Sequence, residues 1–188
     1  ELTDQKTFVG IENIQGGAQY DLSIKDRKNY DVEGVIYSID EESEFKIFDN
    51  CCVKIPAQLP IAQNCTVKAK KDGKEIAIKE LVLPADEDLY EVGLSFDSQK
   101  EVLIIENDNG LETFVNIINK TMTKSLFVKN TDGSENYKTF ISDGEYSSTF
   151  AKLSNDVTLS NGISIGCSSD TPYRGFFDCN GKTIKIRN

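Results

Sequence analysis

The chain has 188 residues and a formal net charge of −10, from 21 lysines and arginines against 31 aspartates and glutamates. It contains no histidine and no tryptophan, which excludes imidazole catalysis and His-ligated zinc or haem. The acidic balance disfavours nucleic acids and anionic membrane surfaces as partners, because both require clustered cations. The longest aliphatic run covers residues 102–105, far short of the roughly 20 residues that span a bilayer. We therefore expect no nucleic-acid binding and no membrane insertion.

Turn-forming dipeptides separate alternating apolar segments along most of the chain. Asp-Gly, Asn-Gly and Gly-Gly pairs suit type I′ turns, which join antiparallel strands. Six of them, in chain order, are Gly16-Gly17, Asp72-Gly73, Asn109-Gly110, Asp143-Gly144, Asn161-Gly162 and Asn180-Gly181. Folding the chain about five of these turns predicts which residues face each other. The facing pairs are Val9–Ile24 at Gly16-Gly17, Val67–Ile78 and Lys70–Glu75 at Asp72-Gly73, Ile104–Val115 at Asn109-Gly110, Tyr137–Phe150 at Asp143-Gly144, and Phe177–Ile184 at Asn180-Gly181. At Asn161-Gly162 the apolar faces do not match, which predicts a bulge, a longer loop or a corner.

Two further segments complete the predicted strands. Residues 32–49 predict a hairpin about the acidic run 40–44, with Tyr37 opposite Ile47. The predicted hairpin at residues 102–117 is apolar on both faces, which indicates a central position covered on both sides. Helical patterns are short, because residues 86–92 and 113–123 have no capping box followed by a long apolar stripe.

These patterns predict an all-β fold, mainly antiparallel, with many hairpins and little helix. Many short strands between frequent turns are typical of a β-sandwich, immunoglobulin-like or jelly-roll-like. A proline and an acidic run in segment 83–88 indicate a linker, which divides the chain into β-sandwich parts at residues 1–83 and 89–188. The alternative is a single large β-sandwich over residues 1–188.

The cysteines fall into an early group of three and a late group of two. They are Cys51, Cys52, Cys65, Cys167 and Cys179. The late pair flanks a short loop, which predicts a local disulfide, and one of the two adjacent cysteines is predicted to pair with Cys65. Because a strand alternates faces, the other adjacent cysteine stays free or bonds to another chain. The alternative is that all five thiols are reduced and buried.

Two acidic segments offer oxygen ligands of the kind that calcium takes. The candidate calcium ligands are Asp86, Glu87, Asp88 and Asp108. No acidic segment has EF-hand spacing, so the alternative interpretation is a set of solvated turns. We expect no other metal and no organic cofactor.

The loop between the late cysteines contains Tyr173, Arg174 and Phe176, which are candidates for a binding loop. Aromatic and arginine side chains are enriched at binding hot spots. The alternative is a structural turn in which Arg174 pairs with a carboxylate. Glycosylation sequons begin at Asn64 and Asn119.

No residue pattern singles out catalytic residues, so we expect a non-catalytic module that acts at the cell surface or outside the cell. Its expected partner is another protein or a cell-surface receptor, contacted in adhesion, recognition or assembly. The odd cysteine and the terminal strand at residues 182–187 favour, as an alternative, a self-assembling subunit of a filament or viral surface assembly. A carbohydrate-binding module or a hydrolase that uses carboxylates alone is a further alternative.

Overall fold

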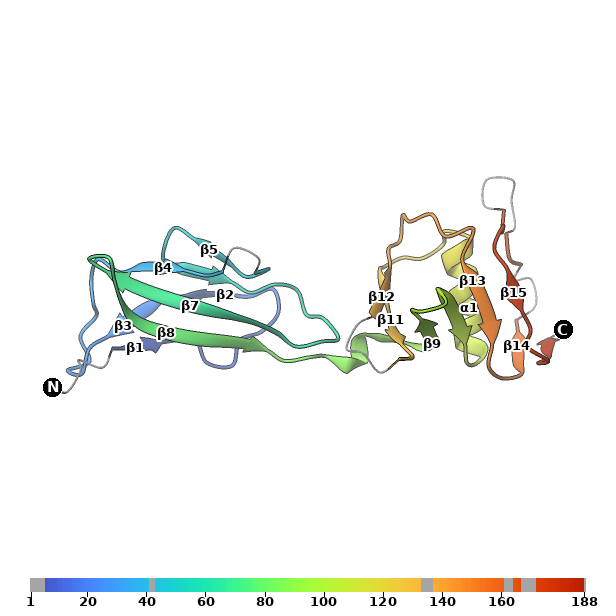
Figure 1. Ribbon diagram of the computed structural model, residues 1–188, viewed down its shortest axis with the longest axis horizontal. Coiled ribbons are helices and arrows are strands. Elements are labelled where there is room, and N and C mark those ends of the chain that lie inside the picture. The colour runs from blue at the N-terminus through green and yellow to red at the C-terminus, as the bar shows by residue number, and fades with distance from the viewer. Residues whose placement is uncertain (1–5, 41–42, 133–136, 161–163, 167–171, 188) are drawn as a thin grey trace. The chain divides into compact units, whose positions relative to one another are not determined.

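The computed structural model divides the chain into two compact units, residues Glu1–Glu87 and Asp88–Asn188. The structure describes residues 6–40, 43–132, 137–160, 164–166 and 172–187. Strands make up 42% of the described residues and helix 8%, which confirms the prediction of a β-rich fold with little helix. Figure 1 shows the strands and helix α1.

Unit 1 contains three antiparallel sheets. The sheet orders are β1-β3, β2-β6-β5 and β4-β7-β8. The strands are β1 (Thr7–Val9), β2 (Gln19–Asp21), β3 (Ser23–Lys25), β4 (Ile36–Ser38), β5 (Lys46–Phe48), β6 (Cys52–Lys54), β7 (Gln63–Lys71) and β8 (Lys74–Leu83). Strands β7 and β8 form the long hairpin that Figure 1 shows in green.

The core of unit 1 follows from alternation along its strands. On β7, Cys65, Val67 and Ala69 are buried, while Asn64 and Lys70 are exposed on the opposite face. The buried core residues are Ile11, Ile14, Leu22, Ile24, Tyr37, Phe45, Val53, Ile55, Cys65, Val67, Ala69, Leu81 and Leu83.

The predicted Asp72-Gly73 hairpin is confirmed at its turn. Both residues have positive φ, 51° and 75°, and the pair Lys70–Glu75 forms as predicted. A bulge between Ala69 and Lys70 then shifts the register, so that Ile78 faces Lys68. The predicted pair Val67–Ile78 is therefore wrong by one position.

The predicted hairpin about Gly16-Gly17 is wrong in register and in extent. Strands β1 and β3 do pair antiparallel, but Phe8, not Val9, faces Ile24. The chain turns away after β1, with positive φ at Gly10 and Asn13, and β2 pairs with β6 instead. Since a one-residue shift exchanges the two faces, Phe8 packs against the core and Val9 is exposed.

The predicted pairing of Tyr37 with Ile47 is also wrong. Strand β4 pairs with β7, and β5 pairs with β6, so the two strands lie in different sheets. Alternation of apolar and polar residues identifies the buried face of a strand, but it does not identify the neighbouring strand. Here β4 pairs with the longer strand β7 and not with β5.

Unit 2 is built on one mixed six-stranded sheet, in the order β12-β11-β9-β10-β13-β15. Its pairs include parallel ones, β9–β11, β10–β13 and β13–β15, so the prediction of a mainly antiparallel fold is wrong for this unit. A separate parallel pair joins β14 and β16. The elements are η1 (Glu87–Leu89), β9 (Tyr90–Asp97), β10 (Val102–Ile105), α1 (Asp108–Ile118), β11 (Leu126–Asn130), β12 (Tyr137–Phe140), β13 (Phe150–Leu153), β14 (Val157–Leu159), β15 (Phe177–Asp178) and β16 (Ile184–Ile186).

Helix α1 replaces the hairpin predicted about Asn109-Gly110. Asn107 is the N-cap, and its side chain accepts a hydrogen bond from the Gly110 amide at 3.0 Å. The apolar residues that follow recur at helical spacing, so they form one buried stripe against the sheet instead of alternating. The stripe comprises Leu111, Phe114, Val115, Ile117 and Ile118.

Two other predicted hairpins of unit 2 form their turns but not their strand pairs. At Asp143-Gly144, the Gly144 amide donates to the Ile141 carbonyl at 3.0 Å, yet β12 pairs with β11 and β13 with β10. At Asn180-Gly181 both φ values are positive, yet β15 and β16 join different partners. The predicted pairs Tyr137–Phe150 and Phe177–Ile184 are wrong, because a turn reverses the chain without fixing which strand it joins. The segment at Asn161-Gly162 lies outside the described residues.

The core of unit 2 lies between α1 and the sheet. Its buried residues are Leu94, Phe96, Leu103, Ile105, Leu111, Phe114, Ile117, Ile118, Leu126, Val128, Phe140, Ala151, Leu153 and Val157.

Candidate binding site in the second unit

A pocket of about 410 Å³ opens at the end of the six-stranded sheet where β9 ends and β10 begins. Aromatic side chains form much of its lining, and charged side chains of both signs surround them. The lining residues are Phe96, Lys100, Glu101, Lys138, Phe140, Glu145, Tyr146, Ser148, Thr149 and Phe150.

The loop singled out by the sequence braces one wall of this pocket. The Arg174 amide donates to the Ser147 carbonyl at 2.7 Å, and the Tyr173 hydroxyl donates to the Thr149 carbonyl at 2.9 Å. Gly175 fits closely here, since a Cβ on it would lie 2.2 Å from the Thr149 oxygen. The loop and the wall are thereby held together by backbone and side-chain hydrogen bonds.

The three loop candidates have different environments. The Tyr173 ring packs edge-on against Phe114 at 5.8 Å, and burial raises the pKa of its hydroxyl to about 12. Arg174 is exposed and forms no ion pair with any carboxylate of the described residues. Phe176 is 63% exposed. Tyr173 is thus a structural residue, while Arg174 and Phe176 are available for contact.

Phe176 does not stand alone on the surface. Its ring meets that of Phe150, itself 50% exposed, at a centroid distance of 6.3 Å and in an edge-on arrangement. Phe150 also lines the pocket, so the aromatic pair forms part of the pocket rim. Nothing in the sequence indicated that Phe150 and Phe176, 26 positions apart, would meet.

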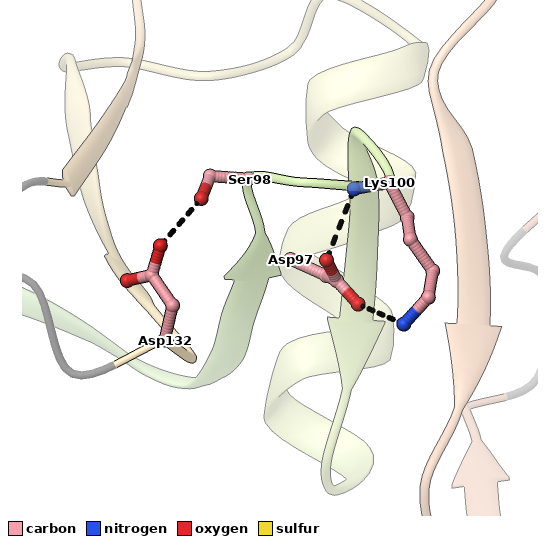
Figure 2. A network of polar contacts seen from close by, with 4 residues as sticks. All are labelled: Asp97, Ser98, Lys100 and Asp132. Atoms are coloured by element: carbon pink, nitrogen blue, oxygen red, sulfur yellow. Dashed lines mark hydrogen bonds and ion pairs between the residues drawn. The ribbon is translucent and has the colours of Figure 1, made fainter.

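A polar network fixes the turn between β9 and β10 (Figure 2). Lys100 donates to the two carboxylate oxygens of Asp97, from its backbone amide at 3.0 Å and from Nζ at 2.8 Å. The side-chain hydrogen bond from Lys100 is the main cause of a lowered pKa of Asp97. The Ser98 hydroxyl donates to Asp132 at 2.8 Å and ties this turn to the end of β11.

Other pocket residues are also engaged in contacts. The Lys138 ammonium lies 5.7 Å from the centre of the Phe96 ring, and Glu145 forms an ion pair with Lys120 at 3.7 Å. The Tyr146 hydroxyl accepts a hydrogen bond from the Ile141 amide at 2.7 Å. These contacts hold the side chains of the pocket lining in place. The pocket therefore presents a surface suited to polar and aromatic contact.

The sheet carries a second aromatic group that the sequence did not single out. On one face, the Tyr137 ring meets Phe127 at 5.1 Å and Tyr90 at 6.5 Å, both edge-on. The Lys129 ammonium lies 5.3 Å from the centre of the Tyr90 ring. The group comes from β9, which begins at Tyr90, and from the outward positions of β11 and β12, while Leu126 and Val128 face the core.

The candidate calcium ligands do not form a metal site. No group of three or more His, Cys, Asp or Glu side chains among the described residues is placed to hold a metal ion. Asp108 occupies the first turn of α1, where its carboxylate accepts a hydrogen bond from the Thr158 amide at 2.6 Å. The Asp86 amide donates to the Leu59 carbonyl, and Glu87 lies in η1.

The predicted disulfide between Cys65 and one of the adjacent cysteines is wrong. Cys51, Cys52, Cys65 and Cys179 are all free thiols, and Cys65 is buried in the core of unit 1. Burial raises the pKa of Cys65 to about 11. Cys167, the predicted partner of Cys179, lies outside the described residues.

The two sequons differ in accessibility. The Asn119 amide nitrogen donates to the Ser164 carbonyl at 2.7 Å, and its oxygen accepts from the Gly166 amide at 2.8 Å. Asn119 is therefore a structural residue at the end of α1. Asn64 is exposed on the outer face of β7.

Comparisons of the chain with protein-family models, curated proteins and solved structures found no match. No helix among the described residues is long and apolar enough to cross a membrane.

Proposed function

We propose that the protein is a non-catalytic module that binds another protein through the aromatic rim of the pocket in unit 2. The observation that carries this proposal is the Phe150–Phe176 pair, in which two large apolar side chains at least half exposed meet beside a concave surface. Exposed aromatic side chains in a preformed setting are the usual anchors of protein interfaces.

The surroundings of the rim support the same function. Lys100, Lys138, Glu101 and Glu145 line the pocket with both signs of charge, as in the polar border around an interface core. As parts of the same proposal, the module acts at the cell surface or outside the cell, and the antiparallel strands of unit 1 pack as an immunoglobulin-like or jelly-roll-like sandwich.

Site-specific photo-crosslinking in the protein's native host tests this function. A photoreactive phenylalanine analogue at position 176 is expected to capture a distinct polypeptide, and Phe150→Ala in the same chain is expected to abolish that capture. The matched control places the analogue at Asp143, an exposed turn residue of the same unit. Capture of the same polypeptides from both positions, or no effect of Phe150→Ala, would contradict the proposal.

The free edge of β16 favours a second candidate function, self-assembly by strand addition. Within the described part of the chain β16 pairs only with β14, and Ile186 is 67% exposed. The Thr183 carbonyl and the Arg187 amide bond to β14, so by parallel-strand geometry the backbone groups of Ile184 and Ile186 point to the free edge. Such an edge can pair with a strand of another copy.

Sedimentation velocity over a range of concentrations tests self-assembly. If β16 mediates it, the wild type forms oligomers and Ile186→Pro, which removes an outward-pointing amide, is monomeric with unchanged melting temperature. A strict monomer at high concentration would rule this candidate out.

A further inference from the structure

Unit 1 presents two adjacent thiols in contact at a tight turn. Cys51 and Cys52 end the β5–β6 hairpin turn, and their sulfur atoms lie 3.6 Å apart. Cys51 is exposed, and Cys52 is partly exposed. A disulfide bond is about 2.0 Å long, so closure brings the sulfurs together from 3.6 Å and, because adjacent Cα atoms lie only about 3.8 Å apart across a trans peptide, also distorts the Cys51–Cys52 backbone.

The backbone of this turn is held on both sides. Asn50 accepts a hydrogen bond from the Tyr37 amide at 3.1 Å and donates to the Val35 carbonyl at 3.2 Å. The Cys51 carbonyl accepts from the Leu22 amide at 2.6 Å. The two thiols are therefore presented by a fixed piece of backbone.

A carboxylate is placed beside one of the thiols. Asp21 faces Cys52 across the β2–β6 pair, and the Cys52 thiol donates to its carboxylate at 3.1 Å. The hydrogen bonds to Asp21 and to Cys51 raise the pKa of Cys52 to about 12. Cys52 thus stays protonated in the resting protein, and its proton already points to an acceptor.

We propose that Cys51 and Cys52 form a redox-active dithiol that exchanges with small-molecule disulfides and closes to a vicinal disulfide. The Cys51 thiolate attacks one sulfur of the external disulfide, forms a mixed disulfide and releases the first thiolate. Cys52 passes its proton to Asp21, attacks the Cys51 sulfur and releases the second thiolate, which then takes up a proton from Asp21 or from water. The dithiol loses two electrons and two protons, and the external disulfide is reduced to two thiols.

The order of attack follows from exposure and hydrogen bonding. Cys51 is open to a solute, while Cys52 is engaged with Asp21 until its neighbour becomes part of a disulfide. Cys65 is buried, and no described cysteine lies beside Cys179, so neither offers the same reaction within the described residues.

Peptide mass analysis tests the reaction directly. Trypsin cleaves after Lys46 and Lys54, and the peptide of residues 47–54 contains Cys51 and Cys52 and no other cysteine. After full reduction and exposure of the folded chain to oxidised glutathione, this peptide is expected to lose two hydrogen atoms without gaining glutathione. Hydrogen exchange at Leu22, whose amide bonds to Cys51, is expected to change at the same time.

Matched variants separate the roles of the two thiols. Cys52→Ser is expected to stop at a stable glutathione adduct on Cys51, and Cys51→Ser to leave Cys52 unmodified. Asp21→Asn is expected to slow ring closure severalfold and to let the adduct accumulate. Serine keeps a hydroxyl donor for Asp21, so Cys52→Ser is expected to fold normally. Cys179→Ser serves as the control and leaves the closure rate unchanged.

Three results would overturn the proposal. The wild-type peptide 47–54 could keep both thiols under conditions that modify Cys179. It could instead carry two glutathione adducts that never close. Equal reaction of Cys52 in the Cys51→Ser variant would show that the assigned order of attack is wrong.

Discussion

Gly110 marks the place where α1 comes closest to the sheet. A Cβ on this residue would lie 1.9 Å from the Gly93 carbonyl oxygen, a backbone atom that cannot turn aside. Glycine-to-alanine changes in a helix usually stabilise it by about 1 kcal/mol. Here the contact with the Gly93 carbonyl makes such a change destabilising instead.

Gly110→Ala is therefore expected to lower the free energy of unfolding by about 1–3 kcal/mol, the usual cost of overpacking. Chemical denaturation followed by circular dichroism measures the change. Glu112→Gln on the same helix keeps an acceptor for the Ser160 hydroxyl, so it is the control and is expected to change stability little. A Gly110→Ala protein as stable as the wild type would contradict the close approach of α1 to β9.

The Asp97–Lys100 contact makes a prediction about acid stability. Because the pKa of Asp97 is lower in the folded chain, its ionised form stabilises the fold above the unfolded pKa, near 3.8, and this contribution is lost as the pH falls. Asp97→Asn is expected to lower the melting temperature at neutral pH, with the difference from wild type shrinking below about pH 4. Asp143→Asn, which removes the same charge at an exposed turn, is the matched control.

The free cysteines differ in exposure and therefore in reactivity. Cys51 and Cys179 are exposed, whereas Cys65 is buried and its pKa is raised to about 11. Iodoacetamide applied to the folded, reduced protein at neutral pH is expected to label Cys51 and Cys179 well before Cys65. Equal labelling of Cys65 in the folded chain would show that its position in the core is wrong.

At the scale of elements, α1 depends on its N-cap. The Asn107 side chain caps the helix, and it also fills the space next to Gly93, where a Cβ would lie 2.1 Å from its oxygen. Asn107→Ala is expected to cost about 1 kcal/mol of stability, measured by denaturation. Asn107→Ser keeps a capping oxygen and is expected to recover most of the loss. Equal losses in both variants would show that the cap does not stabilise the helix.

The elements also show which signals in the sequence were sufficient to predict secondary structure. Turn chemistry at Asp72-Gly73 located a real hairpin, because both residues adopt the positive φ that a type I′ turn needs. The same reasoning failed at Asn109-Gly110, where the cap at Asn107 and the spacing from Leu111 to Ile118 favour a helix over a turn. Local turn chemistry does not distinguish a hairpin from a helix, because it concerns only the few residues of the turn. The helix forms here because its apolar residues, spaced along eleven positions, bury one face against the sheet.

The candidate site was predictable only in part. The segment containing Tyr173, Arg174 and Phe176 could be recognised from its composition, and it does support the pocket wall. Phe150 could not be recognised, because β13 was expected to pair with β12 and pairs instead with β10 and β15. The partner of a strand depends on contacts distant in sequence, which alternation does not record.

At the scale of the whole molecule, each unit has its own hydrophobic core. Among the described residues, the buried core of unit 2 is formed by residues from Leu94 to Val157, and partly buried residues as far as Ile184 pack against it. A fragment of residues 88–188 is therefore expected to fold on its own and to unfold cooperatively, as measured by circular dichroism and by dispersion of its amide resonances. A fragment without a cooperative transition would show that this core is not sufficient.

The parallel pairing of β10 with β13 has a consequence for the synthesis of the chain. Residues 102–105 cannot pair with residues 150–153 until the latter have been translated. The centre of the sheet is therefore completed only after some fifty further residues. Unit 1, whose strands all precede residue 84, has every partner present long before that point. We expect the nascent chain to pass through a stage in which unit 1 is folded and the apolar edge of β10 is still exposed. Chaperones are expected to bind at that exposed edge.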